Sequence, residues 1–115
     1  MSKSFDFAVE IVSLSQHIKE FHKEYDLSRQ LLRSGTSVGA NVREANNAES
    51  RRDFIHKLSI SLKECSEVIY WLELLERTKY LTETQTKKAK SQAYIIARLL
   101  HSSLKTAKSN LHKQK

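Results

Sequence analysis

Apolar side chains recur at alternating steps of three and four residues in four successive stretches of this 115-residue chain. Such spacing places them along one side of an α-helix, as in the seam of a helical bundle. The chain has no proline to interrupt helices, and only two glycines. Its β-branched residues never alternate with polar ones over the length of a strand. The sequence therefore predicts an all-α fold.

Four helices joined by short connections are predicted, over about residues 5–23, 27–47, 51–78 and 83–109. Helices of these lengths with short connections are typical of an antiparallel up-down-up-down four-helix bundle. The length allows one modest core, so we expect a single domain over residues 1–115. The seam of the first helix is expected to contain Phe7, Ile11, Leu14, Ile18, Phe21 and Tyr25.

Polar residues mark the expected helix boundaries. Ser4 and Asp26 are the N-cap candidates of the first and second helices. Ser50–Asp53 and Thr82–Gln85 have the spacing of capping boxes at the starts of the third and fourth helices, although Asp53 replaces the usual Glu or Gln. The fourth helix is expected to fray after about Asn110.

Both glycines, Gly35 and Gly39, lie in the second predicted helix. Small residues allow a neighbouring helix to approach closely. The run lacks the Lys-Ser/Thr ending and the preceding strand of a phosphate-binding loop. We interpret it as a packing segment. With Glu67 of the third helix, Asn41 and Glu44 of this segment are predicted to form a buried polar cluster that an Arg or Ser from another helix could join. Such a cluster would fix register or oligomeric state or, alternatively, do acid–base work.

The net charge of +7 is unevenly distributed. Residues 84–115 contain eight Lys and Arg and no acid, whereas residues 1–83 contain twelve basic and thirteen acidic residues. An excess confined to one end favours an anionic partner such as nucleic acid. The alternative is a solvated face that keeps the protein soluble.

On a helical wheel, the basic residues of the fourth helix form a stripe about 100° wide that contains no acid. The stripe comprises Lys87, Lys90, Tyr94, Arg98, His101, Lys105, Lys108, His112 and Lys115. Such a ridge can follow a phosphate backbone, because each neutralised phosphate releases counterions. Tyr94 is placed to stack on an unpaired base. No zinc finger, helix-turn-helix spacing or RNA-recognition sheet motif is present to read a base sequence.

A second basic group comprises Arg29, Arg33, Arg43, Arg51 and Arg52. Their forked guanidinium groups suit phosphate, so Arg29, Arg33, Arg51 and Arg52 join the candidate nucleic-acid-binding residues. The competing interpretation pairs at least two of the five with the nearby carboxylates of Glu44, Glu49 and Asp53.

The third predicted helix carries more apolar surface than one seam uses. Tyr70, Trp71 and Leu74 lie beside its main seam and either form an interface with another molecule or cap one end of the core. Self-association is the interpretation we favour.

The sequence gives little support for a metal site, a cofactor site or a catalytic cysteine. The five histidines lack metal-ligand spacing, and Cys65 lies on a core seam without a nearby His, so no metal, cofactor or catalytic thiol is expected. A single cysteine fits a reducing cytoplasm, and no apolar run reaches the length of a membrane span.

Several segments carry a resemblance to a known family. They are residues 30–35 (QLLRSG), 37–45 (SVGANVREA), 52–58 (RDFIHKL) and 62–67 (LKECSE), followed by Trp71 and Leu72. From about Phe5 to Leu100, the chain resembles the four-helix-bundle proteins encoded in intervening sequences of bacterial 23S rRNA genes. Ser37, Asn41 and Glu44 match the family's Ser-x-x-x-Asn-x-x-Glu signature. Ala45 stands where the family often has Gly, and the family's prolines are absent.

The resemblance implies a non-enzymatic bundle that assembles into a ring-like homopentamer. It also implies kinship with accessory proteins of diversity-generating retroelements, which bind a reverse transcriptase and nucleic acid through a basic surface. Two hypotheses follow. The first is an oligomeric protein that binds RNA or DNA backbones with weak sequence selectivity. The second is a scaffold or accessory subunit that docks an acidic or nucleic-acid-processing partner protein.

Overall fold

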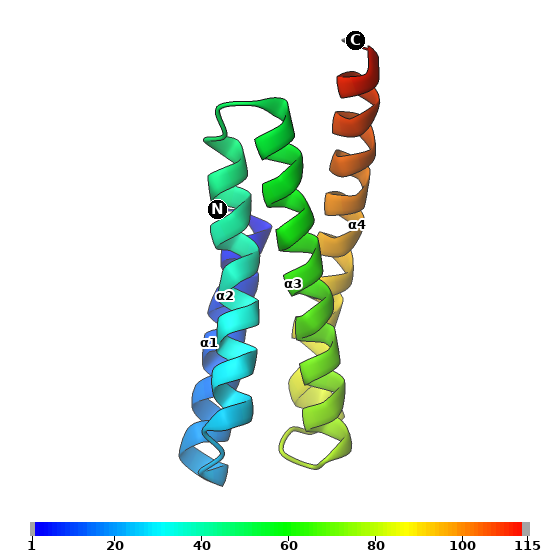
Figure 1. Ribbon diagram of the computed structural model, residues 1–115. Coiled ribbons are helices and arrows are strands. Elements are labelled where there is room, and N and C mark those ends of the chain that lie inside the picture. Colours follow the sequence, from blue (N-terminus) through cyan, green and yellow to red (C-terminus); the bar gives the residue numbers. More distant parts are fainter. Residues whose placement is uncertain (1, 114–115) are drawn as a thin grey trace.

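The computed structural model describes residues 2–113, which form four α-helices (Figure 1). Their bounds are Lys3–His22 for α1, Asp26–Asn46 for α2, Arg51–Arg77 for α3 and Glu83–Lys113 for α4. Successive helices run in opposite directions, and residues 2–113 contain no strand. The predicted all-α, antiparallel up-down-up-down bundle is confirmed.

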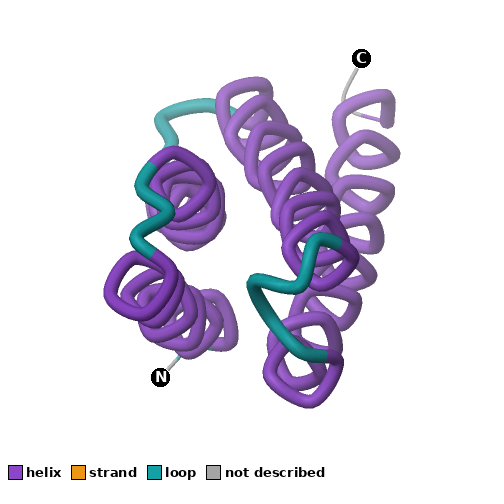
Figure 2. Tube along the Cα trace, turned by 90° about the horizontal axis from the view of Figure 1, so that it is seen from below, coloured by secondary structure: helices purple, strands orange, loops and turns teal. Residues whose placement is uncertain are grey.

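Each helix packs against its neighbours in the chain, and α4 closes the bundle against α1 (Figure 2). The closing contact between α1 and α4 is the least extensive of the four. The molecule is a rod of 54 × 23 × 21 Å. Over the described residues, no helix combines the length and apolar character needed to cross a membrane.

The first two helices begin differently from the prediction. Ser2, not Ser4, caps α1, and its hydroxyl accepts a hydrogen bond from an amide of the first turn. Ser4 is instead buried as a helical residue.

Asp26 is the first residue of α2 and makes no capping hydrogen bond. The carboxylate of Glu24 instead accepts a 2.7 Å bond from the Leu27 amide in the first turn. An N-cap Asp26 would have accepted from the amides of Ser28 or Arg29, so the helix begins one residue earlier than expected.

The last two helices begin as predicted. The Ser50 hydroxyl accepts a 3.0 Å hydrogen bond from the Asp53 amide at the start of α3. At the start of α4, Thr82 and Gln85 form a reciprocal capping box, with bonds of 2.8 and 3.1 Å. These caps fix where the connections to α3 and α4 end.

The predicted seams fill the centre of the bundle. Phe7, Ile11 and Ile18 of α1 are fully buried, but Phe21 and Tyr25 are 73% and 51% exposed. The expectation for these two residues was wrong, because they lie in the last turn of α1 and the connection that follows it, at the end of the bundle. The core also contains Leu31, Val38, Ala45, Leu58, Cys65, Val68, Leu72, Leu75, Ala89, Ala93, Ile96, Leu100 and Leu104.

Gly35 lies where α1 approaches α2 too closely for a larger residue. A Cβ atom at this position would clash with the side chain of Ile11, whose own Cβ it would approach to 2.8 Å. A Cβ at Gly39 would lie 3.4 Å from the Ser4 carbonyl oxygen. The glycines therefore serve close helix packing, as the sequence indicated, and neither has a positive φ.

The aromatic pair on α3 divides between core and surface. Trp71 is half-buried and packs against the core, whereas Tyr70 is 59% exposed. Their rings meet edge-on, with centroids 5.1 Å apart. Trp71 thus contributes to the core of the single chain, and Tyr70 remains on the surface.

The fourth helix is longer than predicted and extends to Lys113 instead of ending near residue 109. Leu104 and Ala107 are only 6% and 4% exposed. The end of α4 thus keeps a buried apolar side, although it extends beyond α1, whose first residues lie below the end of α4 in Figure 1. Packing of an amphipathic face, more than local propensity, decides how far a helix continues.

Candidate nucleic-acid interface

The basic residues predicted on the fourth helix lie mostly on an exposed side of α4. Lys87, Arg98, His101, Lys105, Lys108 and His112 are exposed, and Tyr94 is 52% exposed. Lys115 lies outside the described residues. Within the described chain, no carboxylate comes within ion-pair distance of Lys87, Arg98, Lys105 or Lys108. These four side chains are free to meet an anion.

Lys90 is the exception among the predicted basic residues of α4. Its ammonium group lies 2.8 Å from Oε1 of Glu76, which also accepts a 2.6 Å hydrogen bond from the buried Thr86 hydroxyl. The hydrogen bond from Lys90, with that from Thr86, lowers the pKa of Glu76 below its ordinary 4.5. The bond to Glu76 likewise raises the pKa of Lys90 above 10.5. Lys90 therefore joins α4 to α3 and is not a free phosphate ligand.

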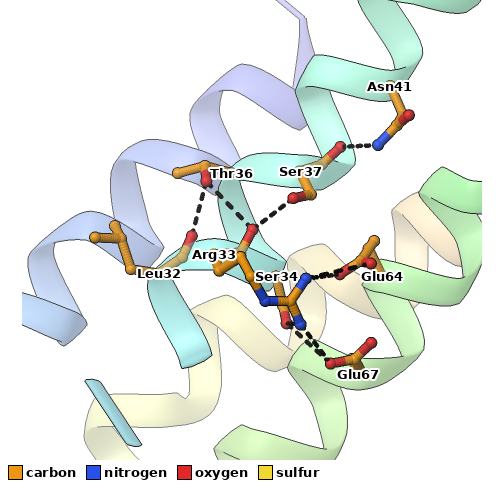
Figure 3. A network of polar contacts seen from close by, with 8 residues as sticks. All are labelled: Leu32, Arg33, Ser34, Thr36, Ser37, Asn41, Glu64 and Glu67. Atoms are coloured by element: carbon orange, nitrogen blue, oxygen red, sulfur yellow. Dashed lines mark hydrogen bonds and ion pairs between the residues drawn. The ribbon is translucent and has the colours of Figure 1, made fainter. Parts of the chain in front are cut away.

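Arg33 is also engaged inside the chain. Its guanidinium lies 3.2 Å from Oε2 of Glu64 and 2.8 Å from Oε1 of Glu67, and Figure 3 shows the fork between the two carboxylates. The Ser34 hydroxyl donates a further 3.3 Å hydrogen bond to Glu67. A guanidinium on α2 that binds two carboxylates on α3 links the two helices. Arg33 is thus unavailable to phosphate in this arrangement.

The remaining arginines of the second group behave differently from one another. Arg29 makes a long, exposed contact of 3.6 Å with Asp26. Arg43, Arg51 and Arg52 are exposed and form no ion pair with any carboxylate of residues 2–113. Two of the five arginines are therefore paired, but with carboxylates other than the three suggested by sequence proximity.

The predicted polar cluster does not assemble within one chain. The Asn41 amide donates to the Ser37 carbonyl of its own helix at 2.9 Å, as Figure 3 shows. Glu44 is exposed and pairs with Lys57 at 3.2 Å. Glu67 bonds to Arg33 and Ser34, and within residues 2–113 no hydrogen bond joins it to Asn41 or Glu44. Asn41 and Glu44 lie on the part of α2 beyond the Arg33 contact, so each finds a partner nearer to it.

Cys65 lies at the centre of the contact between α3 and α4. It is fully buried, and its thiol donates a 3.3 Å hydrogen bond to the Ala93 carbonyl. Burial raises the pKa of the Cys65 thiol to about 11. At neutral pH the side chain is a protonated core group. Over residues 2–113, no group of three or more His, Cys, Asp or Glu side chains is arranged to hold a metal ion.

Sequence reasoning missed the pairing of Lys90 with Glu76 and of Arg33 with Glu64, and it placed Glu67 in a polar cluster without identifying Arg33 as its partner. Glu76 lies 14 residues from Lys90, and Glu64 and Glu67 lie 31 and 34 residues from Arg33. Glu64 and Glu67 are three residues apart, so both fall on one side of α3, and this was the available signal. Which arginine they would meet depends on the register of α2 against α3.

Comparisons with known proteins agree with this architecture. The model of the 23S rRNA-intervening sequence protein family matches residues 1–102. A crystal structure of a Bacteroides thetaiotaomicron protein, described as having unknown function and coming from the S23 ribosomal protein family, is 51% identical in sequence. It superimposes with a TM-score of 0.88 over 90% of this chain and 95% of its own. No curated protein matches the chain.

Proposed function

Because the chain belongs to the 23S rRNA-intervening sequence protein family, we propose that it is a non-enzymatic, homo-oligomeric bundle that binds the backbone of RNA or DNA. The observation that supports nucleic-acid binding is the free charge on α4. Lys87, Arg98, Lys105 and Lys108 are exposed and unpaired among the described residues, on a segment with no acid after Glu83. Arg51 and Arg52 add two further unpaired cations.

Binding of this kind is electrostatic and weakly selective for sequence. Each neutralised phosphate releases counterions, so affinity falls with salt at a slope of about 0.9 per phosphate contact on duplex DNA and about 0.7 on single strands. Side chains on one exposed helical surface position a backbone, and base edges are read only by groups that enter a groove. We therefore expect similar affinities for unrelated sequences.

The test is a titration of fluorescent RNA and DNA across a salt series. We expect binding at low salt and a logarithmic salt slope equivalent to several phosphate contacts. Two unrelated base sequences of equal length serve as the matched pair and should bind alike. Absence of binding at low salt, or an affinity that does not change with salt, would remove nucleic acid from the proposal.

Self-association is supported by apolar surface on the outer side of α1 and α2. Phe5, Val9 and Leu32 are 45%, 56% and 38% exposed. Beside them, a groove of about 750 Å³ is lined by apolar residues, which include Phe5, Ala8 and Val42, and by polar ones, which include Arg43, Glu44 and Asn46. Contiguous exposed apolar surface commonly marks a protein interface. Light scattering should give a multiple of the 13.3 kDa chain mass, with the pentamer suggested by the resemblance as the expected value. A monomer at all concentrations would exclude self-association.

A protein partner is the second candidate function, and one observation favours it. Ile95 and Leu99 are 43% and 49% exposed on α4, beside the basic residues. An acidic protein with an apolar patch, such as a reverse transcriptase or another nucleic-acid-processing enzyme, would match both features. Charge reversal at Arg98 and Lys105 should abolish nucleic-acid binding if the first candidate is right. Replacement of Ile95 and Leu99 by Ser should abolish partner capture if the second is right.

A further inference from the structure

The free positive charge of α3 and α4 gathers at one end of their contact, where α3 begins and α4 ends. We propose that this cationic end, defined as Arg51, Arg52, Lys105 and Lys108, binds double-helical nucleic acid by contacting both of its backbones. The inference rests on the proposed nucleic-acid binding and adds its location and the form of nucleic acid it takes.

The register of the two helices brings these residues together. Cys65 of α3 bonds to the carbonyl of Ala93 in α4, which fixes their relative height. Arg51 precedes Cys65 by as many positions as Ala107 follows Ala93. Since antiparallel α-helices rise equally, by about 1.5 Å per residue, Arg51 lies at the height of the last turns of α4. Figure 1 shows the start of α3 beside this part of α4.

The orientation of the side chains follows from helical periodicity. The separation of Lys90 and Lys108 is a whole number of turns at about 3.6 residues per turn, so they lie on one line along α4. Lys90 reaches across to Glu76 on α3. Lys108 occupies the equivalent position at the other end. On α3, Arg51 lies 25 residues before Glu76, close to seven turns, and therefore on the line of α3 that holds Glu76. Along this line of α4, Lys90 pairs with a glutamate of α3, whereas at the level of Lys108 both helices carry basic residues.

No local carboxylate forms an ion pair with these arginines among the described residues. Glu49, in the connection before α3, is exposed, and Asp53, in its first turn, is half-buried. Neither forms an ion pair with Arg51 or Arg52 among the described residues. Glu44, the remaining carboxylate suggested by sequence, pairs with Lys57. Four cations thus share a surface without an internal partner.

Two rows of cations on neighbouring helices suit a duplex. Packed helices lie about 8–10 Å apart, and long Lys and Arg side chains extend from each. That separation is comparable to the roughly 12 Å groove between the two phosphate backbones of B-DNA. Single strands are generally bound by aromatic stacking beside one cationic track. The exposed tyrosines of α3 and α4 lie elsewhere, because Tyr94 is one turn from Lys90 and the Tyr70 ring packs on Trp71.

The experiment compares a duplex with one of its own strands at equal length and salt, as RNA and as DNA. The variant Arg51→Glu/Lys108→Glu is measured beside Lys3→Glu/Lys19→Glu, which makes the same change of charge at exposed positions on α1. We expect the duplex to bind at least tenfold more tightly than the strand. The first variant should weaken duplex binding about tenfold or more and reduce the salt slope by about 2. The α1 variant should change both much less.

Two outcomes would overturn the inference while leaving nucleic-acid binding in place. One is tighter binding of the single strand, with loss of affinity in Tyr94→Ala. The other is equal weakening by the α1 and cationic-end variants, which would mean that total charge and not this surface attracts the duplex. Failure of duplex and strand alike to bind at low salt would overturn the proposed function itself. Circular dichroism of each variant verifies that the bundle is folded.

Discussion

The two ends of the contact between α3 and α4 use the same helices and opposite arrangements of charge. At the neutral end, defined as Glu73, Glu76, Lys87 and Lys90, a carboxylate accepts hydrogen bonds from Lys90 and Thr86. At the cationic end, the arginines of α3 and the lysines of α4 are exposed, and none of them forms an ion pair among the described residues. The lesson is that a basic stripe on one helix does not define a binding surface until the neighbouring helix is known.

The two ends also differ in how much protein surrounds them. Near the neutral end, Leu72 and Leu75 of α3 are fully buried among the four helices. Near the cationic end, α4 continues beyond the first residues of α1, as Figure 1 shows, so its last turns have fewer neighbouring helices. The cationic end therefore combines free charge with a thinner part of the bundle.

The largest expected effect tests this difference in packing. Leu72→Ala leaves a cavity in the centre of the bundle and should lower the free energy of unfolding by about 2–5 kcal/mol. Leu104→Ala lies where α4 can relax or fray locally and should cost about 2 kcal/mol or less. Denaturant unfolding of both variants measures the two costs. Equal losses would show that the end of α4 is as much a part of the core as Leu72.

A smaller effect is expected from making the neutral end basic. Glu73 is exposed and close enough to Lys90 that its charge helps to raise the Lys90 pKa. Glu73→Lys should extend the cationic surface along α3, raise duplex affinity several-fold and steepen the salt slope by up to about 0.9. Glu20→Lys, at an exposed position on α1, is the matched control. An identical gain in both variants would contradict a special role for the α3–α4 surface.

The smallest effect concerns the acid sensitivity of the neutral end. Because the pKa of Glu76 is lowered by folding, its contribution to stability is present above pH 4.5 and is lost as the pH falls through the lowered value. The wild type should therefore exceed Glu76→Gln in Tm at neutral pH, and the difference should shrink below pH 4.5. Thermal unfolding across this range measures it. A difference that stays constant with pH would mean that the substitution acts by packing and not through the charge.

Much of the fold could be predicted because its signals are local. The three-and-four spacing of apolar residues predicted the helices, and the capping box of Thr82 and Gln85 lies within one turn. The α1 and α2 caps were misassigned because several polar side chains lie near each helix start, and each could cap a helix that begins at a different residue. Ser2 bonds to the Phe5 amide and Glu24 to the Leu27 amide, a choice that composition does not reveal.

The candidate site was only partly predictable, because ion pairs across helices depend on register. Exposure of Arg98, Lys105 and Lys108 followed from their place on the amphipathic wheel. The wheel could not predict that Lys90 pairs with Glu76, or that Arg33 pairs with Glu64 and Glu67. A shift of one turn would give these cations different neighbours with little change in the apolar pattern.

By itself, the sequence determined that the chain forms four amphipathic helices, that glycine permits α1 and α2 to approach closely, and that the excess positive charge lies after Glu83. The tertiary structure decided which of those charges remain free. The physical reason is range: helix formation and capping act within a few residues, whereas neutralisation requires a carboxylate brought within about 4 Å by packing of a distant segment.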